Sequence, residues 1–179
     1  VPAVATAEAV DREGGLVTYR GRLAVEDDPG EVDLVVPATA DEEVLAAFRD
    51  RRTAWRSAMS TPGVVDLVAT GEDPRPWLAT AVEGTPLTDC ELGSVRHRLA
   101  VTTEIAAAFE NVAVGNGRHW DLTPREVRVF DTGGAIPDYA RADVGEFAAV
   151  GDWGLRLAAV RATGEEPPIT PYDAPEQVD

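Results

Sequence analysis

The sequence predicts an α+β fold, in which a small sheet with one helix leads into a second, more helical part. Two observations support this prediction. Short β-like segments surround a helical segment in the first half of the chain, and a long helical segment opens the second half. Strands and helices that follow each other in this segregated order are typical of α+β architecture. The 179 residues suffice for one domain, or for two small lobes that share a core.

Strands in the first half are predicted from β-branched residues and from the turns that bound them. Residues 16–25 and 31–36 are predicted strands, and an Asp-Asp-Pro-Gly turn joins them. Two further short strands are predicted at 64–69 and 76–82, separated by a Gly-Glu-Asp-Pro turn. These segments are expected to form the sheet.

Two helices are predicted from their start signals, their stop signals and their apolar spacing. A capping-box pattern at 39–42 (TADE) opens the first helix, which runs to about Met59 before a Pro-Gly stop. The second helix is predicted at 94–114, before a Gly-Asn-Gly stop. Apolar or small residues recur at helical spacing: Val44, Leu45, Phe48, Trp55 and Met59 in the first helix, and Val95, Leu99, Thr102, Ile105, Ala106, Phe109 and Ala113 in the second.

The rest of the second half is predicted to contain little regular structure. Short strands are expected near 127–131 and 147–151. The C-terminal residues are rich in Gly and Pro, so an extended loop is expected there. Residues from about Leu155 to Asp179 are therefore expected to be the most mobile part of the chain, or to be held by a neighbouring chain.

The charge of the chain is strongly acidic. Asp and Glu number 32 against 16 basic residues, the formal net charge is −16, and every basic residue is an arginine. The acids are scattered, which favours adaptation to molar salt, where high ionic strength screens their repulsion. We therefore expect a salt-adapted cytoplasmic protein of the haloarchaeal type, with a basic partner or a metal-binding surface as the alternative. An acidic surface argues against nucleic acid or an anionic membrane as partner.

Residue types that build metal sites and disulfides are scarce. Cys90 is the single cysteine, which excludes an intrachain disulfide and a cysteine-based zinc site. His97 and His119 are too few for a histidine-rich site. No segment approaches the roughly 20 apolar residues of a membrane helix. The sequence begins without Met or a signal-peptide pattern, so a trimmed chain or a piece of a longer chain is expected.

Three short segments resemble motifs of the eukaryotic-type Ser/Thr protein kinases. Residues 118–124 (RHWDLTP) resemble the catalytic loop H-R-D-L-K-P and follow a long helix, as in that family. Residues 151–155 (GDWGL) resemble D-F-G-L, and residues 170–177 (TPYDAPEQ) resemble the end of the activation segment, P-x-Y-x-A-P-E-Q. Segments 62–67 (PGVVDL) and 77–87 (WLATAVEGTPL) are similar to those that follow helix C and form the hinge. The three motifs together, at compatible spacing, carry the resemblance.

The resemblance implies a protein-kinase-like fold with two lobes. Residues 1–84 would form a small N-terminal antiparallel sheet lobe that includes helix C. Residues 85–179 would form the first part of a helical C-lobe, and the boundary is expected near 83–88. Because the resemblance stops after the A-P-E motif, the remainder of the helical lobe is expected to be missing from this chain.

The resemblance also implies a degraded ATP site. Gly14 and Gly15 are similar to a shortened glycine-rich loop, which would hold phosphate poorly. Val35 stands where the family has the phosphate-binding lysine of V-A-I-K, and the chain contains no lysine to replace it. Strand alternation places Asp33 on the same face, where the family has a small alanine against adenine. The helix C region, 48–56, is basic where a glutamate is expected, and a solvated face that bridges surface acids is the favoured interpretation of its arginines.

Other catalytic positions of the family are retained. Asp121 matches the general base, with His119 as its structural neighbour, whereas Thr123 replaces a lysine of the catalytic loop. Asp152 and Glu126 match metal-binding positions, and glutamate can ligate Mg²⁺ through oxygen. The alternative for Asp121 and Asp152 is that they cap loops and hold backbone amides. No cofactor is required on this interpretation, although weak binding of Mg²⁺ and ATP is conceivable.

Three functions remain open from the sequence. The first is a pseudokinase-type regulatory or scaffolding module for a protein partner or for further domains of a longer chain. The second is an atypical active Ser/Thr kinase that uses Asp121 and Asp152. The third is a non-catalytic structural fragment of a larger salt-adapted protein. The lost lysine and the shortened loop favour the first, so phosphate transfer at a useful rate is not expected.

Overall fold

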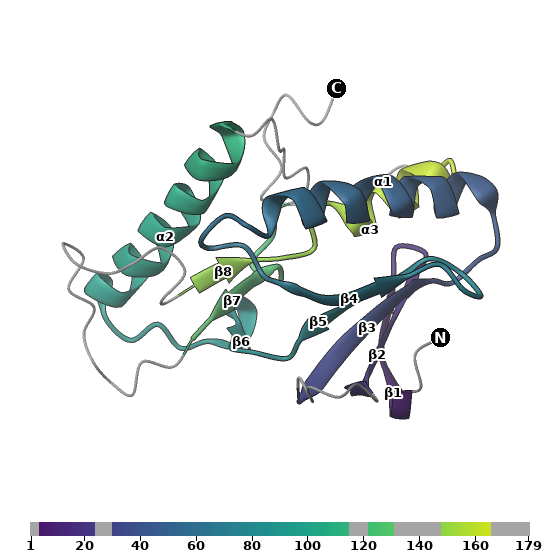
Figure 1. Cartoon of the computed structure of the whole chain (residues 1–179). Coiled ribbons are helices and arrows are strands. Elements are labelled where there is room, and N and C mark those ends of the chain that lie inside the picture. The colour runs from purple at the N-terminus through teal and green to yellow at the C-terminus, as the bar shows by residue number, and fades with distance from the viewer. Residues whose placement is uncertain (1–3, 24–29, 115–121, 131–147, 166–179) are drawn as a thin grey trace.

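The computed structural model describes residues 4–23, 30–114, 122–130 and 148–165, and within them the strands form two sheets (Figure 1). Sheet A has the order β1-β2-β3-β5-β4, with antiparallel neighbours throughout. Sheet B has the order β6-β7-β8 and is also antiparallel. The strands are β1 (Val4–Glu13), β2 (Leu16–Leu23), β3 (Glu31–Pro37), β4 (Leu67–Gly71), β5 (Trp77–Ala81), β6 (Thr85–Pro86), β7 (Val127–Val129) and β8 (Ala148–Val150).

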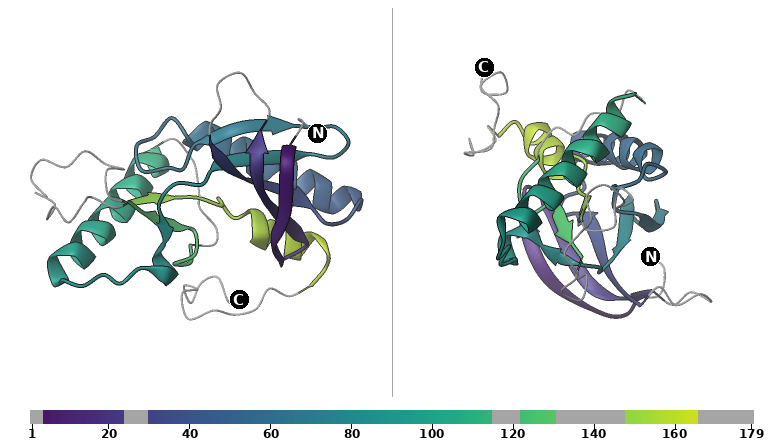
Figure 2. Two further views of the ribbon diagram at one scale, coloured as in Figure 1. Left: turned by 90° about the horizontal axis from the view of Figure 1, so that it is seen from below. Right: turned by 90° about the vertical axis from the view of Figure 1, so that its left-hand side faces the viewer.

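Helices cover the two sheets on the same side of the molecule, as Figures 1 and 2 show. They are α1 (Glu42–Ala58), the 3₁₀ turn η1 (Leu87–Asp89), α2 (Val95–Val114) and α3 (Leu155–Ala162). Helices α1 and α3 pack against each other over sheet A, and α2 packs against β8 of sheet B. The chain passes from sheet A to sheet B between Ala81 and Thr85. The division into two domains near residue 84 stays a prediction.

Helix α1 begins at a side-chain cap. The N-cap is Asp41, whose carboxylate accepts a hydrogen bond from the backbone N–H of Glu43 at 2.8 Å. Thr39 was expected in that position, but its hydroxyl oxygen instead accepts a bond from the N–H of Asp41. The helix starts two residues later than the capping-box pattern predicts, because the carboxylate of Asp41, and not the hydroxyl of Thr39, accepts from a free N–H group of the first turn. The buried side of α1 agrees with the predicted apolar face: Val44, Leu45, Phe48, Trp55 and Ala58.

The main core lies between sheet A, α1 and α3. Trp153, in the turn before α3, and Leu155, at the start of α3, are 1% exposed and pack with residues of β2, β5 and α1. The indole N–H of Trp55 donates to the carbonyl oxygen of Val65 at 2.8 Å, so the aromatic ring is buried without losing its hydrogen bond. This core fixes α3 relative to sheet A, which decides the geometry of the cleft described below.

The C-terminal part of the described chain is more ordered than the sequence predicts. Residues 155–162 form the helix α3, and Leu155 and Ala159 are buried in the main core. The expectation of an extended loop is therefore wrong for this segment, whereas its expected mobility stays a prediction. Its later part, 166–179, lies outside the described residues. Strand β1 and the short strand β6 were also not predicted, and the strand expected at 64–69 is observed at 67–71 as β4.

Helix α2 turns part of its apolar side toward solvent. Val95 and Leu99, both in its predicted apolar series, are 73% and 57% exposed. The side that meets sheet B instead carries small residues and Val101, with Ala100 and Ala108 buried. Among the described residues, no helix is long and apolar enough to cross a membrane.

Candidate functional site: a charged cleft between the two sheets

A cleft of about 600 Å³ lies where sheet A, sheet B and α3 meet. Strands β1, β2, β3 and β5 supply one wall, and the segments that lead into β6, β7 and α3 supply the other. Its charged lining residues are Asp11, Glu13, Arg20, Asp33, Asp89, Arg125, Glu126, Arg128, Asp152 and Arg156. The chemistry of the cleft is thus set by ion pairs between carboxylates and guanidinium groups.

Asp33 is the centre of the first ion-pair group. It lies on β3 directly opposite Arg20 of β2 and is 6% exposed. The guanidinium of Arg20 donates two parallel hydrogen bonds to the carboxylate, at 2.9 Å from Nε and 3.1 Å from Nη2. Arg128 of β7 places a second guanidinium 3.7 Å from the same carboxylate. Sheet B therefore contacts sheet A through Asp33, and the hydrogen bonds that Arg20 donates to Asp33 raise the pKa of Arg20.

Val35 lies two residues along β3, on the same face as Asp33. It pairs with Leu78 of β5, while Asp33 pairs with Thr80, and Val35, Asp33 and Thr80 all line the cleft. An aliphatic side chain at this position offers no charge or hydrogen-bond donor to a ligand. The strand alternation used in the sequence analysis is confirmed here, whereas the role of both residues toward a nucleotide stays a prediction.

Arg156, in the first turn of α3, is the centre of the second ion-pair group. Its Nη1 lies 2.8 Å from Oδ2 of Asp11 and 2.9 Å from Oε2 of Glu13, both at the end of β1. Its Nε lies 3.6 Å from Oδ2 of Asp152 and 4.0 Å from Oε1 of Glu126. One guanidinium thus bridges β1 to the turn that precedes β7. Arg125 adds a further pair with Glu13.

These contacts shift the pKa values of the partners. Burial raises the pKa of Asp11, but the hydrogen bond and charge of Arg156 and the backbone N–H of Arg12 outweigh it, so the pKa lies below its ordinary value of 3.8. Burial lowers the pKa of Arg156, but the charges of Asp152, Asp11 and Glu13 raise it by more, so the pKa lies above its ordinary value. Both groups are therefore held in their charged forms.

The turn before α3 has an uncommon backbone conformation. Asp152, Trp153 and Gly154 have φ values of 62°, 53° and 74°, in the left-handed region that non-glycine residues rarely adopt. The Trp153 ring is buried in the core, and the N–H of Gly151 donates to the carbonyl oxygen of Glu126 at 2.8 Å. A strained backbone of this kind persists only where the surrounding packing holds it in place, and it is common at functional sites. Here it directs the carboxylate of Asp152 into the cleft.

The Gly14-Gly15 turn between β1 and β2 lies over α3. A Cβ atom added to Gly14 would lie 3.1 Å from Cγ2 of Val160 and 3.3 Å from the carbonyl oxygen of Arg156. Gly14 and Gly15 have φ values of 57° and 72°, which favour glycine. The turn that resembles a shortened glycine-rich loop therefore lies over a helix of the same chain, as the left view of Figure 2 shows, and its role toward phosphate stays a prediction.

The structure brings together several of the residues predicted for the site. Asp33, Val35, Glu126 and Asp152 all line the cleft. Asp121 and His119 lie outside the described residues. The sequence analysis did not identify the arginines of the cleft or the acids of β1: Arg20, Arg125, Arg128, Arg156, Asp11 and Glu13. Two signals in the sequence could have identified some of these residues. One is the spacing of four between Asp152 and Arg156, and the other is the register of the β2–β3 hairpin, which places Arg20 opposite Asp33.

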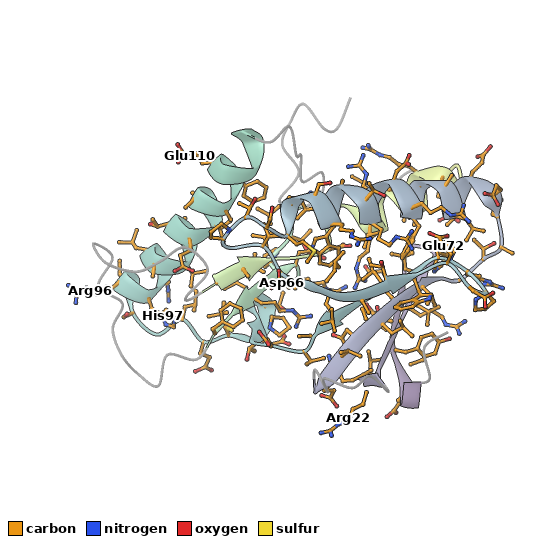
Figure 3. The ribbon with its side chains drawn as sticks, in the orientation of Figure 1. Arg22, Asp66, Glu72, Arg96, His97 and Glu110 are labelled. Carbon is orange, nitrogen blue, oxygen red and sulfur yellow. The ribbon has the colours of Figure 1, made fainter. Side chains whose placement is uncertain are left out.

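The basic face of α1 lies away from these groups. Arg49 pairs with Glu42 and Glu72, and Arg52 pairs with Glu72 and donates to the carbonyl oxygen of Gly71 at 2.6 Å. Figure 3 labels Glu72, which lies at the end of β4 near α1. These contacts agree with the interpretation that the arginines of this helix bridge surface acids. The carboxylate of Asp33, in the cleft, pairs with Arg20 of β2 and Arg128 of β7.

The metal and nucleotide implied by the kinase resemblance do not fit this arrangement. The guanidinium of Arg156 lies beside Asp152 and Glu126, where a cation would be needed, and Val35 supplies no charge for phosphate. Within the described residues, no group of three or more His, Cys, Asp or Glu is arranged to hold a metal ion.

Comparisons with known proteins support the fold. Neither a protein-family model nor a curated protein matches the sequence. The structure is similar to solved kinase domains of PknI from Mycobacterium tuberculosis, determined as variants. One matches with a TM-score of 0.56 and 18% identity over 86% of this chain and 61% of that domain. Another matches with a TM-score of 0.57 and 18% identity over 85% of this chain and 62% of that domain.

The chain thus spans about three fifths of the domains that it resembles. Identity below one fifth carries information about the fold and none about activity. The antiparallel sheet A with α1, followed by α2, sheet B and α3, fits a sheet lobe and part of a helical lobe. This chain has a protein-kinase-like α+β fold.

Proposed function

We propose that this chain is a kinase-like domain with a degraded ATP site, which acts as a pseudokinase-type regulatory or scaffolding module. The observation that carries the proposal is the position of Arg156. A guanidinium held by Asp11, Glu13 and Asp152 occupies the charged end of the cleft, where phosphoryl transfer would need a metal ion and phosphate. A regulatory module requires a folded surface and no turnover.

Val35 and Asp33 support the same proposal from the other end of the cleft. A nucleotide base would meet a buried carboxylate that already accepts two hydrogen bonds from Arg20. Displacing Arg20 would leave the buried carboxylate of Asp33 without its closest partner, which is unfavourable even though Arg128 compensates in part. Binding of ATP is therefore opposed by the ion pair itself as well as by the missing lysine.

The assay is transfer of labelled phosphate from ATP to the chain itself or to a generic protein. It is run in molar KCl with Mg²⁺ or Mn²⁺, on this chain and on the full-length protein. We expect no labelling above background, and no rise in melting temperature with ATP. Labelling that disappears in Asp121→Asn and Asp152→Asn, but persists in the exposed Asp66→Asn control, would overturn the proposal.

One observation favours the second candidate, an atypical active kinase. Asp152 and Glu126 both remain at the cleft, so a conformation with α3 displaced would present two carboxylates. The labelling assay decides between the two candidates. A regulatory role is then separated from a purely structural one by a copurifying partner that is lost when the exposed α1 residue Arg56 is changed to Glu.

A further inference from the structure

Helix α2 presents a stripe of exposed side chains on the side opposite sheet B. Figure 1 shows this helix at the end of the molecule that lies away from sheet A. Its buried residues, among them Val101, Glu104 and Ala108, lie on one side of the helix. The exposed stripe recurs at helical spacing on the other side and consists of Val95, Leu99, Thr102, Thr103, Ala106 and Glu110.

The first half of this stripe is apolar. Among the described residues, the large apolar side chains classed as exposed are Val10, Val95 and Leu99, so two of the three lie here, one helical turn apart. Single exposed apolar side chains are common on protein surfaces, whereas neighbouring ones with a polar border are typical of contact surfaces. The border here includes Arg96 and Glu110.

The charges of α2 are placed against the dipole of the helix. Arg96 and Arg98 lie in the first turn, which has no acidic residue, and the last turn has no basic residue. The N-terminal end of a helix carries partial positive charge and favours acids, whereas the C-terminal end favours bases. The arrangement is unfavourable for α2 alone. It becomes favourable beside an antiparallel helix, because the positive end of each helix then meets the negative end of the other.

The stripe is also close to symmetrical along the helix. Leu99 and Ala106 lie at equal distances from the midpoint between Thr102 and Thr103, and Arg96 and Glu110 lie at equal distances from Thr103. Figure 3 shows Arg96 and Glu110 near opposite ends of α2, both pointing away from sheet B. A surface of this kind is complementary to itself under a twofold rotation, which is the requirement for a closed dimer.

We infer that the exposed stripe of α2 binds the same stripe on a second copy of this chain, with the two helices antiparallel. Leu99 of each copy then packs against the small Ala106 of the other, which allows the helix axes to approach to about 8–10 Å. Arg96 of each copy pairs with Glu110 of the other. The inference goes beyond the proposed function, because it names one partner of the module and makes no use of the cleft.

The test is sedimentation velocity of the 179-residue chain at about 5 µM to 1 mM, in about 1 M KCl. One helix stripe is smaller than the roughly 800 Å² per partner of a standard interface, so we expect a weak dimer with a dissociation constant of about 10–100 µM. Leu99→Glu should weaken the dimer at least about tenfold, because both copies lose the apolar contact and bury a charge instead. Position 99 is 57% exposed, so the fold should tolerate this change.

A charge exchange tests the pairing of the two helices. Arg96→Glu should weaken the dimer at least about threefold, because it places two acids opposite each other, and adding Glu110→Arg should restore the affinity. Both changes agree with the helix dipole, so α2 should remain folded. The control is Arg161→Glu, the same change of charge at an exposed position on α3, which should leave the dissociation constant unchanged.

A chain that stays monomeric up to about 1 mM would overturn the inference and would leave another protein, or other residues of this chain, as the cover of the stripe. Equal affinity in Leu99→Glu and the unaltered chain would overturn it too, as would a double variant no tighter than Arg96→Glu. Phosphate transfer would overturn the proposed function alone, since sedimentation uses no ATP. Either statement can therefore fail while the other stands.

Cross-linking measures the orientation directly. In a Cys90→Ser background, which removes the single cysteine, Thr103→Cys is compared with Ser94→Cys under air oxidation. Antiparallel helices bring position 103 close to itself across the twofold axis, and they separate the two copies of position 94 by most of the helix. We expect disulfide-linked dimers with Thr103→Cys and none with Ser94→Cys. Equal cross-linking at both positions would indicate parallel helices and overturn the inference, as would its absence at position 103.

Discussion

The pair between Arg20 and Asp33 should make a measurable contribution to the stability of the fold. The perturbation is a double-mutant cycle of Arg20→Ala and Asp33→Asn. The substitution at Asp33 preserves the size of a side chain that is 9% exposed, but it removes the charge and one acceptor of the two parallel bonds. A charge-assisted hydrogen bond typically contributes about 1.5–3 kcal/mol.

The expected loss of stability depends on how far the side chains of Arg20 and Asp33 are exposed to solvent. Loss of one partner of a fully buried pair costs about 3–5 kcal/mol. The Arg20 side chain is 39% exposed, so solvent screens the pair, and Arg128 at 3.7 Å compensates in part for its loss. We therefore expect each single variant to lose about 1.5–2.5 kcal/mol, with a coupling energy of about 1–2 kcal/mol.

The assay is urea unfolding in about 1 M KCl, followed by circular dichroism. The control is Arg12→Ala, an exposed arginine on the neighbouring strand, which should change stability by about 0.5 kcal/mol or less. A coupling energy below about 0.3 kcal/mol would refute the reasoning, because additive effects would mean that the two groups do not stabilise each other. A loss in Arg12→Ala equal to that in Arg20→Ala would refute it as well.

Further predictions concern pH, the glycine turn and salt. Arg156 holds the pKa of Asp11 below 3.8, so the pair contributes its full stability above about pH 3.8. That contribution is lost as the pH falls through the lowered pKa. The free energy of unfolding should therefore fall less on acidification in Asp11→Asn than in the unaltered chain. Gly14→Ala should be less stable than Gly15→Ala by about 1–3 kcal/mol in urea unfolding. Both glycines have positive φ, but only a Cβ at position 14 would press on Val160 and Arg156. Equal losses of stability in the two variants would contradict the close packing of α3 under this turn. Dialysis from molar KCl to dilute buffer should reduce the circular dichroism signal, because the net charge of −16 is then screened over about 10 Å instead of about 3 Å; an unchanged melting temperature would contradict salt adaptation.

The sequence predicts the elements that carry local signals. Helix α1 has a capping side chain and an apolar face, and β2 and β3 are β-branched runs on either side of a Pro-Gly turn. Strand alternation alone places Asp33 and Val35 on one face, which the structure confirms. Such features depend on neighbours in sequence, so the amino-acid order is sufficient to find them.

Helix α3 lacks the usual local signals. Its N-cap is Gly154 in a left-handed conformation without a side-chain cap, and the segment contains just eight residues. A helix this short is stabilised by tertiary packing more than by its own propensity. Leu155 and Ala159, at a spacing of four, are the sequence trace of its buried side. Strand β1 was missed for a related reason, since its sequence, VATAEAVDRE, mixes small and charged residues without a regular alternation of apolar and polar ones.

The arginines of the cleft could not be assigned from local pattern, because their partners lie far away in sequence. Arg156 meets Asp11 across 145 positions, and Arg128 approaches Asp33 from the other sheet. All basic residues of the chain are arginines, and some of them, such as Arg49, pair with acids outside the cleft. The tertiary fold is needed to separate the cleft arginines from that background.

If the proposed function holds, the carboxylates of Asp152 and Glu126 either have no task in the cleft or hold α3 in place. If they have no task, changing Asp152 to Asn would relieve repulsion between acids and stabilise the fold. If they hold α3 through Arg156, Asp152→Asn should destabilise the fold and speed amide exchange in α3. The ion pair between Arg156 and Asp152, at 3.6 Å, favours the second account.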